Sequence, residues 1–453
     1  MKRIFARNLT YLYTSIFCAG IQNIVTQMFF DRNYPNEKDT LLSITLFFGA
    51  FFTMLGILAS SPEVEGRSAH PYASKRSRGV LVAVMVGTVL VTFSGLFFVK
   101  SFLAYTILFS AASFCVNYIY NILDVFLTAT VEERHKTHSV RVLLGYQMAG
   151  YVIAPLFFSC FVETPAICIG FTVLAGLLGY LPAGFEYIGK GLVRKEAEGK
   201  AEGERASGAA GVVSADGAGA EAKVEVGAAV VTGADAEAKV EVGAAVLAGA
   251  GGADAQTIRG DHLAMAYCFF TFMAFYILMP SVAYLLKDYL GIENYAVQSS
   301  LFMAGVVVVS SLVIALGPAK KLWKFRIATP IFSVAALLLL MITRSSHPAV
   351  LATAVIICGF GYGTFLSGGR SYVNEGEAGR NLVNRYNKNM TIASLLAYLL
   401  AAGISFLCER SGTEVIPVKF GMIYLFLAAA AVISLVGLGG KRTAAIEQMG
   451  RGE

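Results

Sequence analysis

The sequence predicts an all-α, polytopic membrane protein with twelve transmembrane helices arranged as two six-helix bundles. Three observations favour this fold class. Of the 453 residues, 56% are hydrophobic and only 15% are charged, whereas soluble domains are about 45–50% apolar and about 25% charged. Twelve apolar segments are each long enough to cross a hydrocarbon core of about 30 Å. One long stretch rich in Gly, Ala, Glu and Val separates the sixth segment from the seventh.

The predicted spans each hold about 17–25 mostly apolar residues. The first of them is too long for the apolar region of a signal peptide and lacks a small-residue cleavage site, so it is expected to remain as a helix. The first six spans are Leu9–Phe30, Thr40–Ser60, Gly79–Val99, Phe102–Thr128, Arg141–Phe161 and Pro165–Tyr187. The second six are His262–Leu286, Ala296–Gly317, Arg326–Thr343, Ala349–Gly369, Asn387–Cys408 and Phe420–Gly439.

The interruption between the two sets contains a tandem repeat, because the sequence of Ala220–Val230 recurs letter for letter as Ala236–Val246. Two short copies among Gly-Ala runs bury too little apolar surface to offset the entropy of ordering, which predicts a disordered linker. A regulatory or partner-binding segment is the alternative. The predicted organisation is a first bundle over 1–188, a cytoplasmic linker over 189–260, a second bundle over 261–440 and a cytoplasmic tail over 441–453.

The basic residues predict the orientation of the spans. With a cytoplasmic N-terminus and the long linker left out, 21 Lys and Arg residues fall in cytoplasmic loops and tails. Seven fall outside, namely Arg32, Lys38, Lys100, Lys287, Arg344, Arg410 and Lys419. Because cytoplasmic loops of membrane proteins carry the excess of Lys and Arg, both termini and the linker are expected in the cytoplasm.

Short motifs accompany this layout. After the second span, Gly56-Ile-Leu-Ala-Ser60 is followed by the basic run Lys75-Arg-Ser-Arg78, and Gly317-Pro-Ala-Lys-Lys321 occupies the equivalent loop of the second half. The fifth span begins at Arg141 and carries spaced glycines before Pro155. Small residues at such spacing let membrane helices approach closely.

The layout and these motifs resemble the major facilitator superfamily of secondary transporters, whose two six-helix halves are joined by a long cytoplasmic loop. The resemblance covers the chain outside the linker, and it implies a central cavity lined by helices 1, 4, 7 and 10. In that family the loop after helix 2 usually opens with an Asp where this chain has Ser60, so the charge-based latch of many members lacks its carboxylate here.

Polar residues in the fourth span form one helical stripe, since Asn117, Asn121, Asp124 and Thr128 recur at intervals of four, three and four residues. Asp124 is the one acidic residue well inside a span. Three interpretations remain open for it: a gating ion pair with Arg141, Arg370 or Arg385, a carboxylate that couples transport to protons, or a partly solvated residue without a special role.

Amide side chains gather in the first span, where they bond either neighbouring helices or a ligand. The resemblance implies the second role for residues on cavity-lining helices. The candidate substrate-binding residues are Gln22, Asn23, Thr26, Asn117, Asn121, Tyr267, Thr271, Tyr276 and Tyr362. Pro280 and the run Gly359-Phe-Gly-Tyr-Gly363 are interpreted as hinges, with close helix packing as the alternative for the glycines.

The sequence therefore predicts a secondary active or facilitative transporter that moves a small polar solute by alternating access. Amide, hydroxyl and phenol groups suit an uncharged or zwitterionic solute such as a nucleoside or sugar better than a polyanion. The expected partners are the lipid bilayer, the solute and, under one interpretation, a coupling proton, with no nucleic acid, no cofactor and no metal. The expected location is the plasma membrane.

Two other functions stay open: a membrane chaperone or receptor that keeps the fold without transporting, and a carrier of the equilibrative nucleoside transporter type. The latter has eleven spans with an external C-terminus, whereas this chain has a twelfth apolar segment followed by Lys441-Arg442. An enzyme is not expected, because all five His residues lie in loops or at span ends and no nucleophile motif is present.

Overall fold

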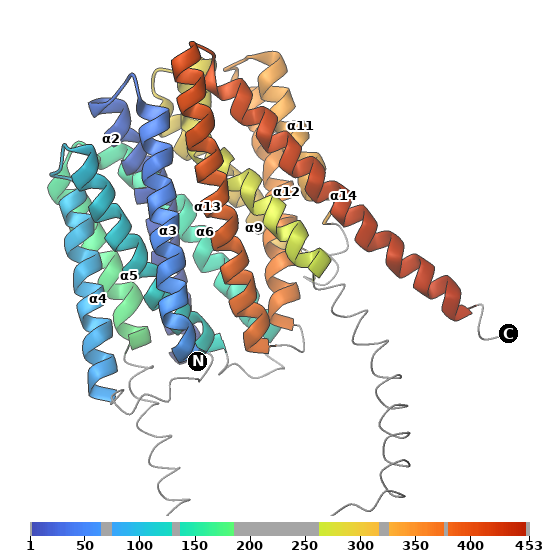
Figure 1. Ribbon diagram of the computed structural model, residues 1–453, viewed down its shortest axis with the longest axis horizontal. Helices are drawn as coiled ribbons and strands as arrows, with labels where there is room; N and C mark the ends of the chain where they lie inside the picture. The colour runs from blue at the N-terminus through green and yellow to red at the C-terminus, as the bar shows by residue number, and fades with distance from the viewer. Residues whose placement is uncertain are drawn as a thin grey trace, which may run out of the picture. The chain divides into compact units, whose positions relative to one another are not determined.

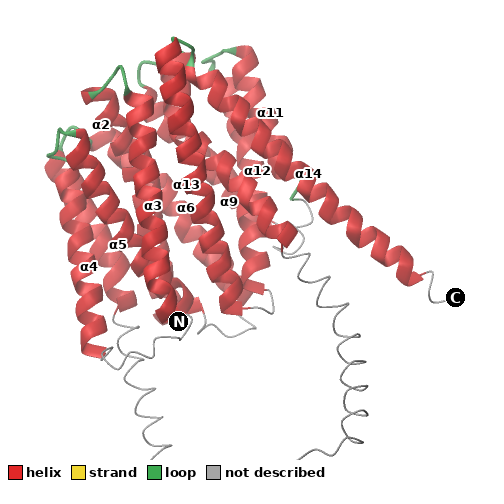
Figure 2. Cartoon of the chain, in the orientation of Figure 1, coloured by secondary structure: helices red, strands yellow, loops and turns green. Residues whose placement is uncertain are grey.

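The computed structural model describes residues 2–64, 75–128, 136–184, 262–316, 326–375 and 379–449, apart from side chains near several helix ends. These residues form helices joined by short loops, with no β-strand among them (Figure 2). Met1–Ile188 and Met265–Glu453 belong to one compact unit, separate from Gly189–Ala264. We call the two stretches of the compact unit the N-half and the C-half.

The N-half begins with a helix that changes its winding. It runs as α1 (Lys2–Ile16), continues without a break as the π-helix η1 (Phe17–Val25), and ends as α2 (Thr26–Asn33). The remaining helices of the N-half are α3 (Lys38–Val64), α4 (Lys75–Leu96), α5 (Phe102–Thr128), α6 (Lys136–Phe161) and the helix Pro165–Gly184.

The first helix of the C-half is His262–Tyr289, which belongs to the compact unit from Met265 on and whose last turn is the π-helix η3 (Leu285–Tyr289). The other helices of the C-half are α9 (Tyr295–Leu316), α11 (Ala328–Thr343), α12 (Pro348–Glu375), α13 (Gly379–Ser411) and α14 (Val415–Met449) (Figure 1). Every predicted span thus corresponds to a helix in the described part of the chain, with ends that differ by up to ten residues.

Eight of the described helices are long and apolar enough to cross a membrane, and Val80–Leu96 and Ala328–Thr343 are shorter apolar helices. Large apolar side chains also lie on the outside of the unit: Val91, Phe98 and Ile342 are 71%, 69% and 77% exposed. Apolar surface of this extent in water would be a liability for a soluble protein, but it is the surface that lipid tails cover. The chain is therefore an integral, multi-pass membrane protein.

The two halves meet along two seams, where α3 packs against α13 and α6 packs against α9. In Figure 1, α3 and α13 run side by side. Within the N-half, α3 also packs on α5 and α1 packs on α6. Because each seam joins one helix from either half, the space between the seams is enclosed by both halves.

Glycines on α12 bring that helix close to its neighbours. A Cβ at Gly359 would lie 2.6 Å from Val309 Cβ, and a Cβ at Gly363 would lie 2.9 Å from the Ser310 backbone of α9. Any larger residue would force α9 and α12 apart. Since α12 is a single unbroken helix across these positions, the glycines act here in close packing, the alternative to the predicted hinge.

Candidate functional site

A cavity of about 190 Å³ lies between the two halves. This volume is below the roughly 300–1,000 Å³ of pockets for drug-sized ligands, so the cavity suits a small solute. None of its described lining residues is acidic or basic. They are Tyr11, Thr14, Ser15, Phe17, Gln22, Asn23, Gly49, Ala50, Thr53, Phe109, Ser113, Asn117, Tyr120, Gln147 and Tyr151 from the N-half, and Phe272, Phe275, Tyr276, Met279, Tyr362, Phe365, Tyr386, Met390, Thr391, Ser394 and Tyr398 from the C-half.

The N-half supplies the amides of the lining. All four, Gln22, Asn23, Asn117 and Gln147, come from this half. The Asn117 amide nitrogen donates to Thr53 Oγ1 at 2.9 Å and to the Ser113 carbonyl oxygen at 2.8 Å. We call the N-half lining the amide wall. Its best-defined group is Asn117, which is held in one orientation between α3 and α5.

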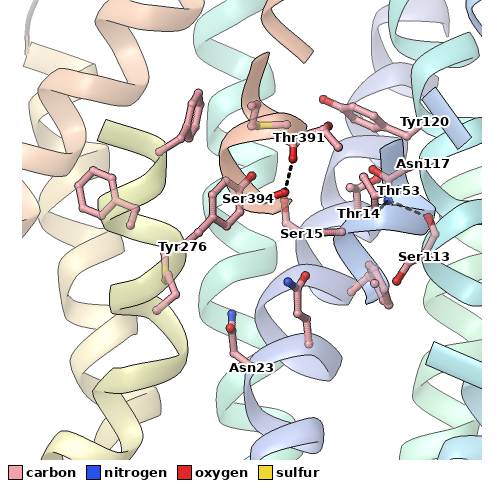
Figure 3. A pocket seen from close by; sticks show the side chains of 18 of the residues that line it. Thr14, Ser15, Asn23, Thr53, Ser113, Asn117, Tyr120, Tyr276, Thr391 and Ser394 are labelled. Atoms are coloured by element: carbon pink, nitrogen blue, oxygen red, sulfur yellow. Dashed lines mark hydrogen bonds between the residues drawn. The ribbon is translucent and has the colours of Figure 1, made fainter. Parts of the chain in front are cut away.

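The C-half lining is mostly aromatic, and we call it the aromatic wall. Its rings touch one another: the Phe275 and Tyr362 centroids are 4.9 Å apart, and those of Phe272 and Phe365 are 5.0 Å apart, both edge to face. Tyr276 packs in the same way on Tyr398 of α13. Figure 3 shows Tyr276 across the cavity from Asn117, Thr53 and Ser113.

The π-helical segment η1 shapes the amide wall. A π-helix places extra residues within the length of an α-helix, and such segments are frequent at functional sites. At the end of η1, the backbone N–H of Thr26 donates to the Ile21 carbonyl five residues earlier, and the Thr26 hydroxyl donates to the same carbonyl at 2.8 Å. Gln22, within the segment, donates across the cavity from its amide nitrogen to the Tyr398 hydroxyl at 3.0 Å. The widened turn therefore carries a direct contact between the halves.

The structure separates the candidate substrate-binding residues into two groups. Gln22, Asn23, Asn117, Tyr276 and Tyr362 line the cavity. The other four are buried between helices, outside its described lining.

Each of those four side chains has a partner inside the helix packing. Thr26 shares a hydrogen bond of 3.0 Å with the Tyr105 hydroxyl, and Asn121 donates to Ser60 Oγ at 2.8 Å. Tyr267 donates to the Arg326 carbonyl at 2.7 Å, and Thr271 donates to the Tyr267 carbonyl at 2.8 Å. Thr26, Asn121 and Tyr267 thus bond neighbouring segments in this conformation, the role that the alternative interpretation of polar groups in spans describes, whereas Thr271 bonds back to its own helix.

The candidate coupling or gating residues Asp124, Arg141, Arg370 and Arg385 belong to α5, α6, α12 and α13. Their side chains lie outside the described residues, so the three interpretations of Asp124 stay open.

Ion pairs join the two halves at the end of the unit where α3 and α14 begin. Lys419 donates to Asp39 at 2.7 Å, and both side chains are buried, with 4% and 9% exposed. Lys287 donates to both carboxylate oxygens of Asp31, at 2.5 and 2.6 Å, and Lys38 lies 2.9 Å from Asp288. We call this set of residues the ionic end. Each of the three pairs joins one residue of the N-half to one of the C-half.

Asp31 lies one residue beyond the first predicted span and is shared by several donors. Burial of its carboxyl opposes ionisation, but hydrogen bonds from Lys287 and the Tyr295 hydroxyl and the charges of Lys287 and Lys38 outweigh burial. The pKa of Asp31 is therefore lowered from its ordinary value. The carboxyl stays ionised in the environment that the ionic end provides.

Amides join the halves nearer the other end of the seam. The Asn387 amide nitrogen lies 3.5 Å from Asn121 Oδ1, and Asn121 in turn donates to Ser60. All three side chains are buried. We call these three residues the amide end. Ser60, where the resemblance expected an acid, thus takes part in a neutral contact.

Sequence reasoning missed much of the aromatic wall. Phe272, Phe275 and Phe365 read as ordinary apolar residues of a span, and Tyr386 and Tyr398 belong to the eleventh helix, which the resemblance did not assign to the cavity. The signal that could have found Tyr398 is a phenol inside an apolar span, because its hydroxyl must find a partner there.

The fold and this cavity define a class: a helical membrane protein with two packed halves around a neutral central cavity. Comparison with solved structures specifies the class further. The chain is similar to an auto-inhibited peptide transporter of the POT family, with a TM-score of 0.59 and 13% identity over 98% of this chain and 97% of that one.

Two other solved structures show the same likeness. A bacterial homologue of the iron transporter ferroportin, outward-facing, has a TM-score of 0.57 and 14% identity over 97% of this chain and 98% of that one. A mutant of the nucleoside transporter NupG has a TM-score of 0.53 and 13% identity over 97% and 99%. The chain therefore has the major facilitator superfamily fold. No protein-family model matches the sequence, and no curated protein matches it.

Proposed function

We propose that this protein is a secondary transporter that moves a small polar solute across the membrane by alternating access. The observation that carries the proposal is the cavity between the two halves, whose described lining is neutral. The halves contact each other on either side of it, through ion pairs at the ionic end and through amides at the amide end. A solute that enters from one side leaves by the other when the contacts at one end part and those at the other end form. A peptide transporter, a bacterial homologue of an iron transporter and a nucleoside transporter share the fold.

The proposed topology has twelve spans as two six-helix bundles, with the bundles over 1–188 and 261–440. Both termini and the segment 189–260 lie in the cytoplasm, and the ionic end faces the outside of the plasma membrane. The basic asymmetry of the loops supports this orientation. In it, Asp31, Lys38 and Asp39 flank the outer membrane surface, where water reaches the rim of the ion pairs.

The coupling ion follows from the role of Asp124. If a proton couples transport, the carboxyl of Asp124 is the candidate carrier, with Arg141, Arg370 or Arg385 as its gating partners. A receptor or chaperone of the same fold would bind the solute in the same cavity without moving it. Transport of a labelled solute therefore separates the two functions.

The test is uptake by the full-length protein in liposomes, measured with a panel of labelled neutral solutes with and without a pH gradient. A bulky residue in the cavity, Ser394→Trp, is expected to abolish the uptake that wild type shows. The matched control on the same helix is Gly403→Trp, because a Cβ there meets nothing within 4 Å, and it is expected to transport. Folded wild-type protein that binds a panel solute but moves none would overturn the proposal in favour of a receptor.

A further inference from the structure

We propose that the solute is a planar, uncharged heterocycle with hydrogen-bond donors on its edge, the chemistry of a nucleobase, free or within a nucleoside. The inference rests on the proposed function, since it names the substrate class of the same cavity. It follows from the division of the lining into an aromatic wall and an amide wall, and from the hydrogen bonds that the lining side chains already make.

The aromatic wall supplies ring faces and edges. Seven of the eleven described lining residues of the C-half are Phe or Tyr. Because Phe275 meets Tyr362, and Phe272 meets Phe365, edge to face, rings of the wall are turned at steep angles to one another. A flat π-system can stack on one ring while its edge meets the next. Met279 and Met390 add polarisable sulfur contacts to the same wall.

Five of the six Ser and Thr hydroxyls of the described lining donate their protons to backbone carbonyls. Thr14 donates to the Thr10 carbonyl at 2.9 Å, Ser113 to the Phe109 carbonyl at 2.8 Å, and Ser394 to the Thr391 carbonyl at 2.8 Å. Each bond returns to the same helix. A hydroxyl has one donor and two acceptor positions, so these side chains offer oxygen lone pairs to a solute.

Asn117 adds a fixed acceptor. A backbone carbonyl only accepts, so the group that faces the Ser113 carbonyl must be the amide nitrogen. That nitrogen uses its two protons on Ser113 and Thr53. Asn117 Oδ1 makes no hydrogen bond among the described residues, and Asn117 lines the cavity. A ligand beside Asn117 therefore meets acceptors and must bring N–H or O–H donors.

The described lining carries no charged side chain, which disfavours an ion as the solute. A cation or an anion would leave its hydration shell without an opposite charge among these residues, which is costly in a low-dielectric site. A peptide or a polyanion would leave its charges unpaired. A neutral ring with amino, imino or hydroxyl donors meets both walls without that cost.

The experiment is counterflow in liposomes that contain the full-length protein, with labelled uridine and adenosine as probes. Unlabelled uracil, adenosine, glucose, tetraethylammonium and dialanine serve as competitors, and thermal stability is measured with each compound. Counterflow of a nucleoside that uracil or adenosine inhibits, but the other three compounds do not, is the expected result. Preferential movement or stabilisation by glucose, tetraethylammonium or dialanine would overturn the substrate class while transport stands.

Binding without movement tests the two proposals separately. Stabilisation by uridine or adenosine without counterflow would support the ligand class and overturn the proposed transport. If no nucleoside or nucleobase shows counterflow and none stabilises the protein, the ligand class is overturned.

Paired variants locate the ligand. Tyr276→Leu and Asn117→Ala are each expected to weaken apparent nucleoside affinity about tenfold, since one removes a ring and the other an acceptor. The controls are Phe360→Leu, which is 41% exposed on the outer surface, and Asn33→Ala, whose amide bonds back to its own helix in the same way as Asn117. Wild-type affinity in both cavity variants would place the ligand elsewhere and overturn the proposal.

Discussion

The ionic end and the amide end join the same two halves with different chemistry. At the ionic end, Lys419 and Asp39 form a buried ion pair at 2.7 Å. At the amide end, the Asn387 amide nitrogen approaches Asn121 Oδ1 only to 3.5 Å, and the side-chain oxygen Oδ1 of Asn387 is buried without a partner among the described residues. The comparison teaches that, among the described residues, the halves are joined by paired charges at one end of the seam and by neutral amides at the other.

The groups at the two ends differ in the strength of their interactions. Breaking a buried ion pair by removing one partner costs about 3–5 kcal/mol, because a charge remains without compensation. A hydrogen bond between membrane helices averages only about 0.6 kcal/mol. Opening the ionic end is different from mutating it, since water enters and solvates both charges. The predictions below separate the two ends by their magnitudes.

The largest effect is expected for Lys419→Ala. The variant leaves the Asp39 carboxylate buried and unpaired, so the free energy of unfolding should fall by about 3–5 kcal/mol. Thermal unfolding of the purified protein measures it, with the exposed Lys100→Ala as control. The double variant Asp39→Asn/Lys419→Met should recover most of the loss, because no charge is left buried. Equal stability of Lys419→Ala and Lys100→Ala would show that the ionic end does not hold the halves together.

A smaller effect is expected for Asp31→Asn, because Lys287 is one-third exposed and water screens the pair. The predicted loss is about 1–2 kcal/mol. Since the pKa of Asp31 is lowered in the folded protein, its contribution is complete above the ordinary Asp pKa and is lost as the pH falls through the lowered value.

Unfolding measured across acid pH checks this linkage. Wild type should lose stability over that range more steeply than Asp31→Asn, and the exposed Glu37→Gln should follow wild type. Parallel profiles for wild type and Asp31→Asn would contradict a linked carboxyl at the ionic end.

The smallest effect is expected for Asn387→Ala at the amide end. The long contact to Asn121 contributes at most about 0.6 kcal/mol, and Asn121 keeps its bond to Ser60. Thermal unfolding should therefore change little more than in the exposed Asn294→Ala. A loss as large as that of Lys419→Ala would reverse the comparison between the two ends.

Part of the site could be predicted from the sequence. Helical periodicity placed Asn117 and Asn121 on one stripe, and the structure gives them different surroundings: Asn117 lines the cavity and Asn121 bonds Ser60 between packed helices. The two residues are one turn apart, about 6 Å along the axis. Periodicity fixes the face of a helix but not the depth at which a neighbouring helix covers that face.

The same limit explains the ionic end. The sequence shows Asp31, Lys38 and Asp39 at a span boundary, where charged residues are ordinary. Their partners Lys287, Asp288 and Lys419 lie about 250 or more positions away along the chain. Only the packing of the two halves decides which carboxylate meets which ammonium group.

The sequence by itself determined that the chain is an integral membrane protein of long apolar helices, because the cost of burying charge and unpaired backbone in lipid restricts composition and segment length residue by residue. The tertiary structure alone decided that seven aromatic rings of one half face the amides of the other across a neutral cavity. That arrangement depends on helix rotation, on the π-helical turn around Gln22 and on contacts between residues far apart in the chain, none of which a local pattern encodes.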